Sequence, residues 1–128
     1  MSYKILIADD EESIRYSYSE ILTGEGYEVE TSATLDDCLN SLSSGDFDLL
    51  FLDIWFGRDN GIDALKTIQQ YSPECDIVMI TGNPQPSSII QSRQHGVRDY
   101  LAKPVRKASL LYVTEHVLSL KQNRSSAS

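Results

Sequence analysis

The sequence predicts a single α/β domain built on a five-stranded parallel β-sheet. Five short runs of apolar or β-branched residues recur along a chain of 128 residues, an ordinary length for one domain. The segments between these runs carry apolar residues three and four positions apart, the spacing of an amphipathic helix. Strands that alternate with helices require right-handed crossovers, so the sheet should be parallel and covered by helices on both faces.

The strands are expected at residues 5–8, 27–31, 49–53, 77–81 and 99–102. The first, third and fourth of these runs are apolar almost throughout. Such runs are typical of strands buried on both faces, so these three strands should form the centre of the sheet.

Residues typical of helix ends mark the first three helices. Gly24 and Gly26 end the first, Thr34 with Asp37 resembles a capping box that begins the second, and Asp59 or Asn60 begins the third, which ends at Ser72 and Pro73. Asn60 and Gly61 also fit a hairpin turn, but the helical pattern that follows them favours a helix start.

The last two helices differ in how strongly the sequence supports them. Residues 88–96 contain only Ile89 and Ile90 as large apolar residues, so a fourth helix there should pack lightly. The fifth helix is indicated by Leu110, Val113, Val117 and Leu120. We expect the domain to cover residues 1–120, and the polar, Ser-rich residues 121–128 to form a flexible tail.

The chain is acidic, with a net charge of −8 and an isoelectric point near 4.6. This charge repels nucleic acids and anionic membrane surfaces, which excludes both as direct partners. Cys38 and Cys75 lack the spacing of metal ligands, so we expect reduced, at least half-buried thiols. No apolar segment follows a basic N-terminal start, which indicates a cytoplasmic protein.

Polar side chains lie at the end of, or directly after, four of the five expected strands. This is the sheet edge at which open parallel sheets bind ligands. They are Asp9 and Asp10 after the first strand, Asp53 at the end of the third, Thr81 at the end of the fourth, and Lys103 with Pro104 after the fifth. Each residue alone has an ordinary explanation, such as a helix N-terminus, a loop cap or a solvated charge. If the first and third strands are neighbours, however, three carboxylates converge, and each pair about 4 Å apart repels by roughly 4 kcal/mol. Such an arrangement calls for a cation.

The predicted ligands favour Mg²⁺, which prefers octahedral oxygen coordination and keeps several waters; Mn²⁺ is an acceptable substitute. Asp10 and Asp53 are the expected direct ligands, Asp9 the ligand that acts through a water, and the backbone carbonyl of Trp55 a further oxygen. His95 and His116 fall on expected helices and are interpreted as surface or packing residues.

These residues resemble the receiver domain of bacterial two-component response regulators, the CheY-like superfamily. That family has an acidic pair after strand one, Asp after strand three, Ser or Thr after strand four and Lys-Pro after strand five. The resemblance runs from Lys4 to about Leu120 and includes Gly61, eight residues beyond Asp53, and the aromatic Tyr100. It implies a flavodoxin-like three-layer (βα)5 fold with strand order 2-1-3-4-5.

The resemblance also implies a function. Asp53 would accept a phosphoryl group from the phosphohistidine of a histidine kinase, assisted by Mg²⁺ and Lys103. Thr81 would then bind a phosphoryl oxygen and Tyr100 would move, which changes the face formed by the fourth helix, fifth strand and fifth helix. That face would control an output domain or target, expected to be transcriptional, and is a possible surface for a homodimer. Such a protein is no enzyme in the usual sense, although Mg²⁺-dependent self-phosphorylation and slow self-dephosphorylation are expected.

The peptide bond between Lys103 and Pro104 resembles the family's cis peptide; an ordinary trans bond is the alternative. Three features depart from the family pattern. Trp55 can overhang the phosphoryl group and hinder water, Gly57 replaces the usual proline and predicts a looser loop, and Pro84 with Pro86 can stiffen the segment after Thr81.

Three other functions are compatible with part of the same sequence. A haloacid-dehalogenase-like phosphatase needs an acidic residue two positions after its nucleophile, where this chain has Trp55. A flavin-binding module needs a loop that attracts phosphate after strand one, where the acidic residues 9–12 repel it. A degenerate receiver used only as a phosphorylation-independent protein-interaction module is disfavoured by the intact acidic set.

Overall fold

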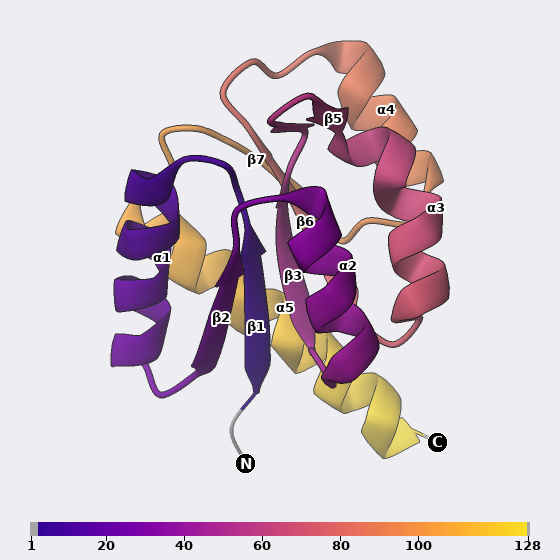
Figure 1. Cartoon of the computed structure of the whole chain (residues 1–128). Coiled ribbons are helices and arrows are strands. Elements are labelled where there is room, and N and C mark those ends of the chain that lie inside the picture. The colour runs from indigo at the N-terminus through magenta and orange to yellow at the C-terminus, as the bar shows by residue number, and fades with distance from the viewer. Residues whose placement is uncertain (1–2, 128) are drawn as a thin grey trace.

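The computed structural model describes residues 3–127 and contains the predicted five-stranded parallel sheet (Figure 1). The elements in chain order are β1 (Lys4–Ala8), α1 (Glu12–Gly24), β2 (Glu28–Ser32), α2 (Leu35–Ser44), β3 (Leu49–Asp53), β4 (Trp55–Phe56), β5 (Asp59–Asn60), α3 (Gly61–Tyr71), β6 (Asp76–Thr81), α4 (Pro86–Gln94), β7 (Asp99–Ala102) and α5 (Lys107–Ala127). The sheet order is β2-β1-β3-β6-β7, which confirms the flavodoxin-like fold. The predicted fourth and fifth strands are β6 and β7, because a short hairpin contributes β4 and β5.

Alternating side chains of the central strands supply two hydrophobic cores, one on each face of the sheet. Leu6 and Leu50 pack with residues of α2 and α3, whereas Ile5 and Leu49 pack with residues of α1 and α5. All four side chains are fully buried. Burial on both faces explains why the central strands read as continuous apolar runs.

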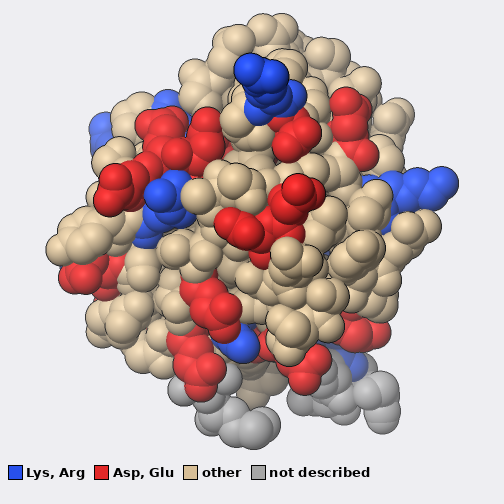
Figure 2. Space-filling view, viewed as in Figure 1, with Lys and Arg blue, Asp and Glu red and all other residues tan. Residues whose placement is uncertain are grey.

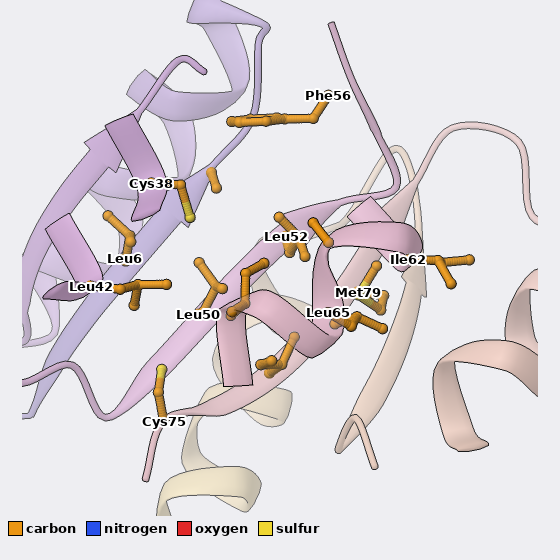
Figure 3. Close-up of a cluster of buried hydrophobic side chains, with 14 of the residues drawn as sticks. Leu6, Cys38, Leu42, Leu50, Leu52, Phe56, Ile62, Leu65, Cys75 and Met79 are labelled. Carbon is orange, nitrogen blue, oxygen red and sulfur yellow. The ribbon is translucent and has the colours of Figure 1, made fainter. Parts of the chain in front are cut away.

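The α2 and α3 side of the core also holds both cysteines (Figure 3). Cys38 and Cys75 are free thiols and are buried, as the sequence predicted. Burial raises the pKa of each thiol to about 12. Because the reactive form of cysteine is the thiolate, both residues behave as apolar core side chains at neutral pH.

Side chains close the N-termini of α2 and α3 as the sequence indicated. Thr34 Oγ1 accepts the Asp37 N–H at 3.1 Å, and Asn60 Oδ1 accepts the N–H groups of Ile62 and Asp63 at 2.8 and 3.3 Å. Of the two cap candidates for α3, the structure therefore selects Asn60 over Asp59. Such caps satisfy amide groups that have no partner within the helix.

Helix α4 is the most weakly packed helix, as predicted. Ser92 is its only buried residue, and Ile90 is 57% exposed. The helix begins at Pro86, two residues before the expected start, because proline has no N–H to satisfy and its fixed φ suits a first helical position.

Helix α5 differs from the prediction in length and in its apolar face. It continues to Ala127, through most of the segment that we expected to be a flexible tail. Arg124 pairs with Asp76 at 2.8 Å, a contact that fastens the end of α5 to the start of β6. Leu120 was expected to face the core but is 40% exposed, whereas Leu118 is buried. Among the described residues, no helix has the length and hydrophobicity needed to cross a membrane.

The ion pairs of the buried Asp76 carboxylate can be removed one at a time to test whether they anchor α5. Its side chain contacts both Arg98, at 3.0 Å, and Arg124. We expect Arg98→Ala and Arg124→Ala each to lower the free energy of unfolding by about 1 kcal/mol, since one guanidinium remains. The double variant should lose about 3–5 kcal/mol, because it leaves a buried charge unpaired.

Urea unfolding of wild type, the two single variants and the double variant measures the coupling between Arg98 and Arg124. The exposed Arg106→Ala is the control. Losses that add within about 0.5 kcal/mol would show that the two arginines act independently.

Candidate functional site

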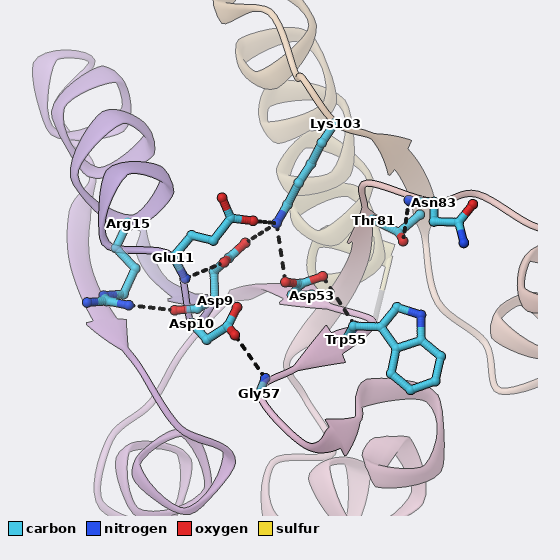
Figure 4. Close-up of polar contacts among 10 residues, drawn as sticks. All are labelled: Asp9, Asp10, Glu11, Arg15, Asp53, Trp55, Gly57, Thr81, Asn83 and Lys103. Atoms are coloured by element: carbon cyan, nitrogen blue, oxygen red, sulfur yellow. Dashed lines mark hydrogen bonds and ion pairs between the residues drawn. The ribbon is translucent and has the colours of Figure 1, made fainter.

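The sheet order brings the predicted acidic residues together at the carboxyl edge of the sheet. Strands β1 and β3 are neighbours, with Ala8 paired to Leu52, so the residues that follow them emerge side by side. Carboxylate oxygens of Asp9, Asp10, Glu11 and Asp53 all lie within 4.8 Å of one another (Figure 4). The geometric condition on which the predicted cation site depends is therefore met.

The four acids differ in exposure. Asp9 and Asp53 are 2% and 5% exposed, whereas Asp10 and Glu11 face solvent. Backbone and side-chain donors hold the acidic pair in place: the Glu11 N–H donates to Asp9 Oδ1 at 2.8 Å, and Arg15 donates to the Asp9 carbonyl at 2.9 Å. Asp10 Oδ2 accepts the Gly57 N–H at 3.2 Å. Asp9 and Asp53 are thus enclosed by the protein, whereas Asp10 and Glu11 lie at its surface.

Lys103 supplies the positive charge of the site. It follows β7, its N–H donates to the Thr81 carbonyl at 2.7 Å, and its peptide bond with Pro104 is cis, as the resemblance implied. Lys103 Nζ lies 2.8 Å from Asp9 Oδ2, 3.0 Å from Glu11 Oε1 and 3.2 Å from Asp53 Oδ2. Burial lowers the pKa of Lys103, but these carboxylates outweigh burial and raise the pKa above its ordinary value.

The site makes the Asp53 carboxyl harder to ionise than an ordinary aspartic acid. Burial, together with the neighbouring Asp9 charge, raises the pKa of Asp53 to about 6, although Lys103 opposes the shift. The carboxylate form, which predominates at neutral pH, is therefore destabilised by the site. A further positive charge next to Asp53 would relieve that destabilisation.

The residues present fit a divalent cation bound through oxygen. The cluster offers four carboxylates against one ammonium, and the buried Asp9 Oδ2 must share that ammonium, which lies 2.8 Å away, with Glu11 and Asp53. An open pocket of about 330 Å³ leads to the cluster and is lined by Asp10, Glu11, Asp53, Trp55, Thr81 and Lys103. An acidic, oxygen-only and solvent-connected site suits Mg²⁺, which keeps part of its water shell.

Thr81 and Tyr100 lie on the neighbouring strands β6 and β7. Thr81 is 1% exposed, and its Oγ1 accepts the Asn83 N–H at 3.1 Å. Tyr100 is partly buried against the α2 and α3 core, and its buried hydroxyl lacks a hydrogen-bond partner among the described residues. Thr81 lines the acidic pocket, whereas Tyr100 is not among its lining residues. The two histidines lie elsewhere: His95 follows α4, and His116 stacks on Tyr112 with ring centroids 6.0 Å apart.

The loop after β3 is a structured hairpin. Its strands β4 and β5 pair antiparallel, with Trp55 opposite Asn60. Gly57 adopts a φ of 62°, a value that proline does not reach, and it donates the N–H that holds Asp10. Gly57 therefore joins the hairpin to the acidic pair, and a loop looser than one with proline stays a prediction. Glycine here makes a contact with the acidic pair that the more common proline cannot make.

Gly61 follows the hairpin as the first residue of α3, and its backbone lies against the backbone at the end of β3. Its N–H donates to the Ile54 carbonyl at 2.5 Å, and a Cβ at this position would overlap the Asp53 backbone oxygen. Local sequence indicated Gly61 only as part of a turn or a helix start, and the resemblance alone linked it to Asp53. Its physical role depends on a contact between backbones, which leaves no pattern in the sequence.

Comparison with known proteins agrees with this geometry. Residues 5–115 match the family model of the response regulator receiver domain. The chain belongs to this family. The receiver domain is 33% identical over 120 residues to the nitrogen assimilation regulatory protein NtrX of Azorhizobium caulinodans, a match that covers 92% of this chain and 26% of that protein. It is also 33% identical over 119 residues to the alginate biosynthesis transcriptional regulatory protein AlgB of Pseudomonas putida, covering 93% of this chain and 27% of that protein.

Solved structures show the same likeness. A CheY-like receiver domain protein from Methanospirillum hungatei JF-1 superposes with a TM-score of 0.92 at 30% identity, covering 97% of this chain and 99% of the other. The beryllofluoride-activated NtrC4 receiver domain dimer gives a TM-score of 0.87 at 29% identity, covering 92% and 98%. The receiver domain spans about a quarter of the length of the NtrX and AlgB relatives.

The raised pKa of Asp53 predicts a stability effect in metal-free protein. Asp53→Asn should increase the free energy of unfolding at pH 7 by about 1–3 kcal/mol, because it removes a buried carboxylate that is costly to ionise. The gain should be small near pH 4, where the Asp53 carboxyl of the folded wild type is protonated, and should reach its full value above pH 6 as that carboxyl ionises.

Chemical unfolding in EDTA across this pH range is the measurement, and the exposed Asp46→Asn is the control. Equal stability of wild type and Asp53→Asn at pH 7 would contradict the destabilised state of Asp53.

Gly61→Ala tests the close approach of the hairpin to β3. We expect a loss of at least about 2 kcal/mol in stability, because the added methyl group meets backbone and the hairpin must shift. Gly24→Ala is the matched control, since a Cβ at Gly24 meets no atom within 4 Å. Similar unfolding midpoints for the two variants would argue against the contact.

Proposed function

We propose that this receiver domain is a phosphorylation switch in which Asp53 is the phosphoacceptor. The observation that carries the proposal is the position of Asp53, at the end of the central strand β3. There it accepts a hydrogen bond from Lys103 at 3.2 Å and opens onto the acidic pocket. A nucleophile, a cation and a site for a divalent ion thus meet at one point.

The metal site would be formed by the residues predicted from the sequence. Asp10 and Asp53 are the direct ligands, the Trp55 backbone carbonyl is a third, and Asp9 acts through a water. Mg²⁺ is the expected ion and Mn²⁺ an acceptable substitute. When bound, the ion neutralises charge on the phosphoryl oxygens.

The transfer step needs no general base, because Asp53 is mostly ionised at neutral pH. An Asp53 oxygen forms a bond to phosphorus while the bond from phosphorus to the histidine nitrogen of the kinase breaks, and the imidazole keeps that electron pair. Lys103 donates a hydrogen bond to a phosphoryl oxygen and so balances the charge of the transferred group. The product is an acyl phosphate on Asp53.

Switching would involve Thr81, at the end of β6, and Tyr100, within the neighbouring strand β7. The Thr81 hydroxyl donates to a phosphoryl oxygen, and Tyr100 moves toward the space that this opens. The face formed by α4, β7 and α5 then changes, and the weak packing of α4 makes it the element that is easiest to displace. An output domain or target reads that face.

The partners follow from the family and its relatives. A histidine kinase is the expected phosphodonor, and a transcriptional output is supported by the likeness to the transcriptional regulatory protein AlgB. A homodimer is supported by the dimeric state of the NtrC4 receiver domain, and the face of α4, β7 and α5 is the surface that the resemblance implies for it. The acidic surface (Figure 2) disfavours direct contact of this domain with nucleic acid, and cytoplasmic location is expected.

Phosphorylation can be tested directly with a small acyl phosphate. Incubation with acetyl phosphate and Mg²⁺ should add one phosphoryl group, detected by intact mass, and the product should be absent with EDTA or in Asp53→Ala. Asp59→Ala, which changes an exposed acid, is the control. Labelling that persists in Asp53→Ala would disprove the assignment of the phosphoacceptor. No labelling of wild-type protein that binds Mg²⁺ would favour a receiver used only for protein contact.

Trp55 should set the lifetime of the acyl phosphate. Its side chain is 56% exposed and lines the pocket beside Asp53, on the side away from Asp9 and Asp10 (Figure 4). There it hinders attack by water. We expect Trp55→Asn to shorten the phosphoryl half-life by about threefold or more, a change of roughly 0.7 kcal/mol or more in the barrier. Decay of the labelled species after removal of acetyl phosphate measures this, and an unchanged half-life would refute the role.

A further inference from the structure

Glu11 contacts the charged lysine of the site, a contact that the sequence did not predict. The Lys103 ammonium donates to Glu11 Oε1 at 3.0 Å and to Asp53 Oδ2 at 3.2 Å, and it lies 2.8 Å from Asp9 Oδ2. A lysine ammonium has three N–H donors. Three carboxylate oxygens therefore surround Lys103 before any phosphoryl group arrives.

A phosphoryl oxygen can reach Lys103 only if one of these carboxylates withdraws. Asp53 stays, because it carries the phosphoryl group. Asp9 is 2% exposed, and the Glu11 backbone N–H holds its other oxygen at 2.8 Å. The Glu11 side chain is 56% exposed, and Lys103 is the only ion-pair partner it has in the described structure. Glu11 is thus the carboxylate that is free to leave (Figure 4).

We propose that Glu11 is a displaceable counter-ion that competes with the phosphoryl group for Lys103 and thereby slows phosphorylation of the resting domain. This inference rests on the function proposed above and adds to it a residue that controls how fast the domain is phosphorylated. Glu11 turns into solvent when the phosphoryl group binds, and it returns when the group is lost. The contact stabilises the unphosphorylated state relative to the phosphorylated one.

The alternative role of Glu11 is that of a metal ligand, since its carboxylate belongs to the same acidic cluster. The two roles predict opposite effects of Glu11→Gln, which keeps the shape of the side chain and removes its charge. Loss of a ligand weakens Mg²⁺ binding and slows labelling. Loss of a competitor leaves Mg²⁺ binding in place and makes Lys103 more available.

The test compares wild type, Glu11→Gln and the control Glu12→Gln, which removes an exposed charge one residue further on. Trp55 is the only tryptophan of the chain and lines the pocket, so its fluorescence reports binding of Mg²⁺ and then of beryllofluoride, a phosphoryl mimic. For Glu11→Gln we expect beryllofluoride affinity and the rate of labelling by acetyl phosphate to rise about 3- to 10-fold, with Mg²⁺ affinity within about twofold of wild type. Glu12→Gln should change all three quantities by less than about twofold.

Each other result contradicts the proposal in a different way. Weaker Mg²⁺ binding together with slower labelling would make Glu11 a ligand, and equal values in wild type and Glu11→Gln would show that the contact has no effect. Equal gains in Glu11→Gln and Glu12→Gln would assign the effect to long-range charge. If wild type binds Mg²⁺ and beryllofluoride but is never labelled, the proposed phosphoacceptor function fails, while the affinity comparison still tests Glu11.

Discussion

The central physical constraint in this domain is the repulsion among carboxylates that the sheet forces together at one edge. Two of them, Asp9 and Asp53, are buried, and burial together with their mutual repulsion makes the ionised form of Asp53 unfavourable. Lys103 offsets this only in part. The site therefore has an unmet demand for positive charge, which supports the proposal that a divalent cation binds there and allows a phosphoryl group to follow.

The fold tolerates this unfavourable edge because the rest of the sheet is strongly stabilised. The strands β1, β3 and β6 are buried on both faces, and two separate cores hold the helices against them. Parallel strands direct every carboxyl end to the same edge, so a rigid sheet holds residues from distant parts of the sequence at fixed separations. The hairpin after β3 adds to this precision, since Gly61 lies against the Asp53 backbone and Gly57 holds Asp10.

Packing strength is distributed unevenly around the sheet, and this distribution suits a switch. Arg124 and Arg98 fasten α5 and the segment before β7 to the buried Asp76, at the edge of the sheet remote from the acidic site. Helix α4 has little buried surface of its own. Under the proposed switch, a change in charge at the site would therefore displace α4 at low cost while the opposite end of the sheet stays fixed. Glu11 and Trp55 lie at the pocket itself, where the proposed roles give them control over how readily a phosphoryl group enters and leaves.

The sequence alone determined the α/β class, the five strands of the sheet, the helix cap at Thr34, and the polar residues at the strand ends. These depend on local periodicity and on residue types, which can be read one segment at a time. Tertiary structure decided the contact between Glu11 and Lys103, the close approach of Gly61 to Asp53, the short hairpin, and the extension of α5 by pairing with Asp76. Each of these joins residues from separate elements, and the energies involved exist only once the sheet has placed those elements next to one another.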